Sequence, residues 1–188
     1  MIKLTLQSLR HLLLWTVLTG LAYPVIVTVL AQVALPKPAN GSLVERHGQL
    51  VGSALLAQPF QGTNYFWPRP SSATYATVPS GASNLGPTSG QQKTNVINNL
   101  AAFRSGNQLA TNADVPADMV YASGSGLDPD ISPAAAELQV ARVATARGMA
   151  ADQVRALVTQ YTQAPQLGFL GQPRVNVLLL NLALDAVK

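Results

Sequence analysis

The sequence of 188 residues contains no cysteine and only two histidines. Without cysteine, the chain forms no disulfide and offers no thiolate ligand to a metal. His11 lies at the edge of an apolar run, and His47 lies in a segment rich in proline and glycine. A Ser-His-Asp site would depend on His47 alone, and no histidine pair has metal-ligand spacing. The sequence therefore predicts no catalytic residue and no metal site.

Charged residues are also scarce, at 11% of the chain against about 25% in ordinary globular proteins. Lysine and arginine total 12 and aspartate and glutamate total 8, but the basic residues are spread singly, without a basic stripe or stacking aromatics. This pattern argues against nucleic acid as a partner. A weakly charged exterior fits a domain covered by partners, and it equally fits a polar, uncharged surface.

The longest apolar feature is the uncharged run from Leu12 to Leu35. As a helix it spans about 36 Å, enough to cross a hydrocarbon core of about 30 Å. A cleavable secretory signal is the alternative, but its apolar region is usually only about 7–15 residues long. Lys3 and Arg10 precede the run, which favours a cytoplasmic N-terminus. We therefore expect a single-pass protein of the inner (cytoplasmic) membrane with an extracytoplasmic domain.

Four residues of this run are candidates for packing against another membrane helix. Thr16 and Gly20 are four positions apart and form a small-residue notch, which permits close approach of two helices in lipid. The Tyr23 hydroxyl needs a partner at that depth, and Pro24 is expected to kink the helix. Glycine and proline are also common in membrane helices generally, so both interpretations remain open.

The chain divides by composition into four parts. We predict a cytoplasmic tail at 1–11, a transmembrane helix at 12–35, a neck at 36–48 and one domain at 49–188. The fold class expected for the whole is α+β: one N-terminal transmembrane helix, then a mixed helix and strand domain with long ordered loops.

Within the domain, residues 58–92 carry too many prolines and glycines for regular structure. Such a long connection is expected to be a functional loop or to be ordered by contact with something else. A strand is expected within 49–57. Apolar spacing and capping residues predict helices at 94–104, 133–147, 151–162 and 177–186, although 175–180 also fits a buried strand.

Two segments have two interpretations each. The backbone amides of a glycine and serine run are candidates for an anion or cofactor cradle beside the helix that follows, although a structural turn is the favoured interpretation. That run is Ser123, Gly124, Ser125 and Gly126. It has no GxxxxGK[ST] pattern, so nucleotide binding is weakly supported. The aromatic segment Tyr65, Phe66 and Trp67, followed by Arg69, is either a buried anchor or an interface patch.

The order of several motifs resembles one known family. The matching stretches are Tyr23-Pro24, Asn40-Gly41-Ser42-Leu43, Val51-Gly52-Ser53, Tyr65-Phe66, Arg69-Pro70-Ser71, residues 80–87, 123–133 and 139–144, Gly168 to Asn176, and Asn181 to Asp185. Together they cover nearly the whole chain after its first residues. On these motifs the chain resembles the KdpC family, the C subunit of the Kdp potassium-transporting P-type ATPase.

The resemblance implies a non-catalytic subunit of a high-affinity, ATP-driven potassium uptake complex. It implies a role in assembly and as a catalytic chaperone that raises the ATP affinity of the ATP-hydrolysing subunit. The implied partners are a channel-like potassium-binding subunit, the P-type ATPase catalytic subunit and a small single-span subunit. No cofactor is expected from chemistry visible in the sequence, and ATP binding enters only through the complex. A membrane-anchored extracytoplasmic binding module is the alternative function.

Overall fold

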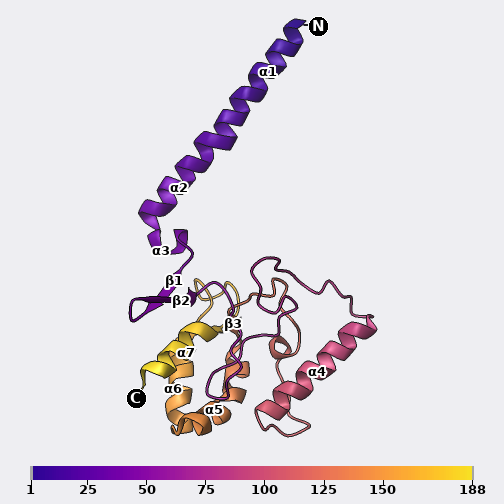
Figure 1. Cartoon of the computed structure of the whole chain (residues 1–188), viewed down its shortest axis with the longest axis vertical. Helices are drawn as coiled ribbons and strands as arrows, with labels where there is room; N and C mark the ends of the chain where they lie inside the picture. Colours follow the sequence, from indigo (N-terminus) through magenta and orange to yellow (C-terminus); the bar gives the residue numbers. More distant parts are fainter. Residues whose placement is uncertain (1, 188) are drawn as a thin grey trace. The chain divides into compact units, whose positions relative to one another are not determined.

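The computed structural model describes residues 2–187, and the chain falls into two compact units that divide between Ser53 and Ala54 (Figure 1). The first unit begins with a continuous helix formed by α1 (Ile2–Val17), the π-helical turn η1 (Leu18–Ala22) and α2 (Tyr23–Ala34). At about 1.5 Å per residue it is roughly 50 Å long. It is long and apolar enough to cross a membrane, and its most apolar stretch buries nothing against the described chain.

The π-helical turn ends at Ala22, two residues before Pro24. Proline has no N–H to donate, and its ring needs space beside the preceding turn. The wider turn meets both needs, because the Tyr23 amide reaches back to the Leu18 carbonyl and the helix continues through Pro24. The helix also begins at Ile2, so the described part of the predicted tail is helical as well.

A short helix and a hairpin complete the first unit. They are α3 (Pro36–Ala39), β1 (Leu43–Arg46) and β2 (Gln49–Ser53), with β1 and β2 antiparallel. The turn residues His47 and Gly48 both have positive φ, 51° and 77°, as a tight two-residue hairpin requires. The strand expected within 49–57 is therefore confirmed. Composition placed the boundary between the neck and the domain at residues 48 and 49. The hairpin crosses this position, and the two compact units divide after Ser53 instead.

The second unit mixes helices with a small sheet, which confirms the α+β class. Its elements are α4 (Gly90–Gly106), the 3₁₀ turn η2 (Ala117–Met119), β3 (Asp130–Ile131), α5 (Pro133–Arg147), α6 (Ala151–Tyr161), β4 (Thr162–Gln163), β5 (Arg174–Asn176) and α7 (Val177–Ala186). The three strands form an antiparallel sheet in the order β3-β5-β4. The core lies between this sheet and α5, α6 and α7, while α4 lies apart from these three helices (Figure 1).

Local capping chemistry explains where these helices begin and end. The Ser132 hydroxyl accepts from the Ala135 amide at 3.1 Å, and Gly148 ends α5 with φ +64°. Asn176 caps α7 through the Leu179 amide at 3.1 Å, so the helical interpretation of its sequence is correct and the strand alternative is wrong beyond Asn176. Ser89 caps α4, which therefore begins at Gly90.

The start of α4 corrects the expectation for residues 58–92. Residues 90–92 belong to the helix, because the Ser89 hydroxyl accepts from the Gln92 amide at 3.3 Å. Glycine at the first position of a helix is tolerated when the residue before it is a good cap. The rest of the stretch, from Gln58 to Thr88, contains no helix or strand, as expected from its composition.

Candidate functional site

The aromatic segment Tyr65 to Trp67 runs extended through the second unit, held by two amide side chains. Asn181 on α7 accepts from the Phe66 amide at 2.8 Å and donates to the Phe66 carbonyl at 3.0 Å. Gln139 on α5 does the same for Trp67, at 2.8 and 3.3 Å. Each side chain therefore replaces the partner that a neighbouring strand would supply. We call Gln139, Asn181 and the segment between them the amide clamp.

Arg142, three residues after Gln139, fixes the chain just before the clamp. Its guanidinium donates from Nε to Asn107 Oδ1 at 2.8 Å, from Nη1 to the Thr63 carbonyl at 2.6 Å and the Tyr65 carbonyl at 2.9 Å, and from Nη2 to Gln139 Oε1 at 2.8 Å. It also stacks over the Trp67 ring, 3.9 Å from the centroid. Arg142 is 6% exposed, and this burial lowers the pKa of its guanidinium to about 10.

A second arginine, Arg147, holds the same end of the segment from the other side of Asn64 and Tyr65. Arg147 Nη2 pairs with Asp185 of α7 at 2.7 Å, and its Nε donates to the Asn64 carbonyl at 2.7 Å. The Tyr65 hydroxyl donates to the same carboxylate at 3.2 Å, and Phe66 is fully buried. The aromatic segment is thus an internal anchor that joins α5 and α7, which confirms the first of its two interpretations.

This group of polar residues was not predicted from the sequence. Gln139 and Arg142 lie three positions apart on the buried face of α5, among Val140 and Val143. The sequence does contain one indication of them: each polar residue occupies a position where the helical period predicts an apolar side chain. The partner of such a residue is not readable from the sequence, because residues 62–67 are more than 70 positions away along the chain.

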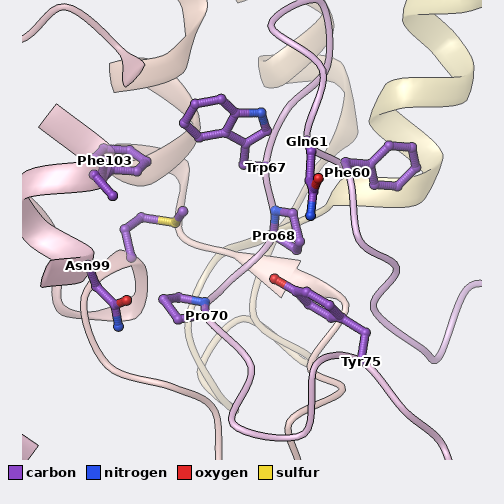
Figure 2. A pocket seen from close by; sticks show the side chains of 10 residues that line it. Phe60, Gln61, Trp67, Pro68, Pro70, Tyr75, Asn99 and Phe103 are labelled. Carbon is purple, nitrogen blue, oxygen red and sulfur yellow. The ribbon is translucent and has the colours of Figure 1, made fainter. Parts of the chain in front are cut away.

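A cavity of about 540 Å³ opens beside the clamp. Figure 2 shows its lining: Phe103 and Asn99 of α4 lie on one side, Phe60 and Tyr75 on the other, and Pro68 and Pro70 follow Trp67 between them. No lining residue is charged. The Tyr75 hydroxyl donates to the Arg69 carbonyl at 2.9 Å, and burial raises the pKa of this phenol above 10.0. The cavity suits an apolar or aromatic group of moderate size.

The Ser123 to Gly126 run packs against the long loop from Gln58 to Thr88, which we call the proline-rich loop. The Ser123 amide donates to the Pro70 carbonyl at 3.2 Å, and the Gly126 carbonyl accepts from the Ser71 hydroxyl at 2.6 Å. Gly126 has φ +71°, and a Cβ there would lie 3.0 Å from the Gly81 carbonyl oxygen. Part of the long loop is therefore ordered by this run, one of the two outcomes expected for it.

Two ion pairs continue this contact toward the sheet. Arg69 pairs with Asp128 at 2.5 Å, and Arg174 pairs with Asp130 at 3.1 Å. Burial raises the pKa of the Asp130 carboxyl, and Asp128 acts in the same direction, whereas Arg174 and a hydrogen bond from Asn176 lower it. Within residues 2–187 no group of three or more histidine, aspartate or glutamate side chains is placed to hold a metal ion.

The four candidate packing residues of the first unit lie around the π-helical turn. Gly20 is within it, Tyr23 and Pro24 follow it, and Thr16 lies one turn before. A Cβ on Gly20 would meet nothing within 4 Å, and Tyr23 is 66% exposed. These positions are thus uncovered by the described part of this chain and remain open to another helix.

Comparison with known proteins covers both units. The profile of the KdpC family, described as the c chain of the K⁺-transporting ATPase, matches residues 5–186. Similar proteins include the potassium-transporting ATPase KdpC subunits of Methylococcus capsulatus (50% identity, covering 96% of each chain) and Rhodospirillum rubrum (56%, covering 90% of this chain and 89% of the relative). That of Sorangium cellulosum is 52% identical and also covers 96% of each chain. This chain therefore belongs to the KdpC family of K⁺-transporting ATPase subunits.

Proposed function

We propose that the chain is the anchored, non-catalytic subunit of a potassium-transporting ATPase, with its N-terminus in the cytoplasm and its second unit outside the inner membrane. The observation that carries this proposal is the family match over residues 5–186, which includes most of the apolar helix. Lys3 and Arg10 near the start of that helix support the orientation. A reporter fused after Lys188 tests it, because only an extracytoplasmic C-terminus activates a reporter that requires export.

The helix packs against a channel-like potassium-binding subunit through Thr16, Gly20, Tyr23 and Pro24. Support comes from the open surface at Gly20 and the exposed Tyr23 hydroxyl. The π-helical turn adds to this, since such turns change which residues share one face of a helix. The ATP-hydrolysing subunit and a small single-span subunit complete the proposed complex.

The second unit covers the potassium entrance of the channel-like subunit. Its low charge and its clamped loops support a role as a rigid cap, because Arg142, Gln139 and Asn181 fix the backbone of the aromatic segment by hydrogen bonds. The proposed chaperone effect on ATP affinity then acts across the membrane. It is a coupling free energy carried by the partner subunits, typically about 1–3 kcal/mol.

For Ser123, Gly124, Ser125 and Gly126 we propose the structural turn in preference to the anion cradle. The amides of Ser123 and Gly126 and the following Leu127 amide donate within the chain, at 3.2, 3.2 and 3.1 Å. Amides already used in this way are poor anion ligands. The run then serves to dock the proline-rich loop.

A binding module for small solutes is the second candidate function. The uncharged cavity of about 540 Å³ beside Trp67 favours this second function. The cavity volume lies within the range of small-molecule sites, and such sites are commonly lined by aromatic side chains. Purification from detergent separates the two functions. A pump subunit brings its ATPase partner along, whereas an independent binding module is recovered alone.

Gly20→Ile tests the packing surface, with Ala22→Ile as the matched control. Both changes introduce isoleucine within the same π-helical turn, but the two positions, two residues apart, lie on roughly opposite sides of the helix. Gly20→Ile is expected to abolish co-purification of the channel-like subunit and growth at limiting potassium, while Ala22→Ile retains both. Normal assembly of Gly20→Ile refutes the packing proposal, and so does equal loss in both variants.

A further inference from the structure

The largest exposed apolar cluster of the loops in the second unit is the tip of a small hairpin, which we call the apolar tip and define as Leu167, Phe169 and Leu170. These side chains are 82%, 73% and 48% exposed. They lie in the connection from β4 to β5, where Gln166 and Leu170 pair across the hairpin with two hydrogen bonds of 2.9 Å. Within residues 2–187, Leu167 and Phe169 are largely uncovered and Leu170 is about half covered.

The stretch of sequence that carries the apolar tip is free of charge, and Glu137 and Arg155 come near only the base of the hairpin, beside Pro165 and Pro173. No lysine, arginine, aspartate or glutamate occurs from Ala156 to Pro173, and the next charged residue is Arg174 at the base of the hairpin. An uncharged approach matters for entry into lipid, because an ionised side chain carried into a bilayer is expensive. An ordinary soluble loop of this exposure carries polar or charged residues at its tip.

The backbone of the apolar tip is also suited to an environment without water. The Gly168 amide donates to the Pro165 carbonyl at 3.1 Å, and the Phe169 and Leu170 amides both donate to the Gln166 carbonyl, at 3.2 and 2.9 Å. Three consecutive donors at the turn are thus satisfied inside the hairpin. Unsatisfied backbone donors are what keeps most loops out of the apolar phase.

We infer that the apolar tip inserts into the outer surface of the bilayer that holds this chain's own helix. The inference rests on the proposed anchoring of that helix. We choose the bilayer as the binding partner because the chain is anchored close to it. Only the residues between the end of α2 at Ala34 and the start of the second unit at Ala54 connect the two, so the bilayer is an apolar phase that stays within reach of the second unit. Three side chains are far fewer than the 20–30 residues a side of a standard protein interface. They suffice for a tethered contact with lipid.

The test uses the full chain reconstituted in vesicles of phosphatidylcholine and phosphatidylglycerol, with lipids brominated near the headgroup end of the acyl chains as quenchers. The native chain has two tryptophans, Trp15 in the apolar helix and Trp67, which is partly buried against the core. Phe169→Trp places an indole in the tip. Ile97→Trp on α4 is the control, because Ile97 is an exposed apolar residue elsewhere on the same unit, at 54%. Both variants carry Trp15→Phe, so Trp67 is a constant background.

The expected result is a loss of emission and a blue shift for Phe169→Trp in brominated vesicles, with neither change for Ile97→Trp. Equal quenching of both variants overturns the inference, because the unit then lies on lipid without using the tip. Quenching of native Trp15 without quenching of Phe169→Trp overturns it while leaving the anchor intact.

Two further outcomes distinguish insertion of the apolar tip into lipid from failure of the membrane anchor and from coverage of the tip by a partner subunit. If native Trp15 is not quenched, the anchor itself fails and the inference falls with it. If Phe169→Trp is quenched in the isolated chain but shielded in the assembled complex, a partner subunit covers the tip and insertion into lipid is refuted as its working state. Retention of quenching in the complex supports the inference.

Discussion

Arg142→Met is expected to destabilise the second unit strongly, because one guanidinium satisfies acceptors from three parts of the chain. Its loss removes the partner of Asn107 Oδ1, of the Tyr65 carbonyl and of the Thr63 carbonyl. Gln139 Oε1 keeps the Trp67 amide as a donor. The Thr63 carbonyl belongs to an exposed residue and finds water. Two buried or half-buried acceptors therefore lose their partner outright.

The magnitude follows from these two acceptors. Each unsatisfied buried group costs about 1–3 kcal/mol, and the stacking over Trp67 contributes about 0.5–2 kcal/mol more. Removing the guanidinium also relieves its own burial, the cost of which is visible in its lowered pKa. The net loss is about 2–4 kcal/mol, a large share of the roughly 5–15 kcal/mol that stabilises a typical domain.

Urea unfolding of the full chain in mild detergent measures this loss. Trp67 is the reporter, in a Trp15→Phe background that leaves it as the single tryptophan. Arg142→Lys is expected to lose nearly as much as Arg142→Met, because an ammonium neither reaches all these acceptors nor stacks in the same way. Arg155→Met is the control, since Arg155 is 47% exposed and its two carboxylate partners lie on the surface.

Unfolding of Arg142→Met at the same urea concentration as Arg155→Met would refute the role assigned to the Arg142 hydrogen bonds. Native stability of Arg142→Lys would refute the part of that role that depends on the shape of the guanidinium. If Arg142→Lys is as stable as the native chain, a positive charge is enough to hold residues 63–65. The separate hydrogen bonds of the guanidinium would then contribute nothing measurable to the free energy of unfolding.

Two further changes probe the Ser123 to Gly126 run and the Asp130 carboxylate, which pairs with Arg174 in the sheet. Gly126→Ala is expected to cost about 1–3 kcal/mol in urea unfolding, because φ is +71° and the added Cβ meets the Gly81 carbonyl oxygen, whereas Gly124→Ala, with open space, has little effect; equal effects refute the packing argument. The folded-state pKa of Asp130 lies above 3.8, so the native chain should lose stability relative to Asp130→Asn as pH rises from 3.8 through that raised value. A gain over the same range, measured by unfolding at a series of pH values, contradicts the proposed burial penalty.

The helices were predictable because their signals are local. Ser132, Pro133 and Gly148 specify α5 within a window of 17 residues, and Asn176 specifies the start of α7 in the same way. The start of α4 was predicted four residues late, because Gly90 was read as a breaker although Ser89 caps the helix. Such errors at the ends of elements arise when two local signals compete.

The arrangement of the long loop was not predictable, because its partners are distant in sequence. Its prolines exclude a regular sheet partner, so its backbone groups had to bind something else. Gln139, Arg142 and Asn181 supply those bonds from two helices. Each looked like an ordinary polar residue within an otherwise apolar helical pattern. The long apolar helix was evident from the sequence, but its π-helical turn depends on how the Pro24 ring is accommodated.

The amide clamp bears on how an external cap could affect a nucleotide site on the other side of a membrane. Coupling between two sites requires an element that both of them bias, and a loop that rearranges freely absorbs the bias instead of transmitting it. Gln139, Arg142 and Asn181 tie the aromatic segment to α5 and α7, so displacement of this segment carries both helices with it. This coupling free energy is reciprocal. If binding of this chain raises the ATP affinity of the ATP-hydrolysing subunit about tenfold, bound ATP raises the affinity of that subunit for this chain about tenfold, which is about 1.4 kcal/mol. A rigid, weakly charged domain is therefore better suited to the proposed chaperone role than a flexible one, because its contacts change as a unit when its partner changes state.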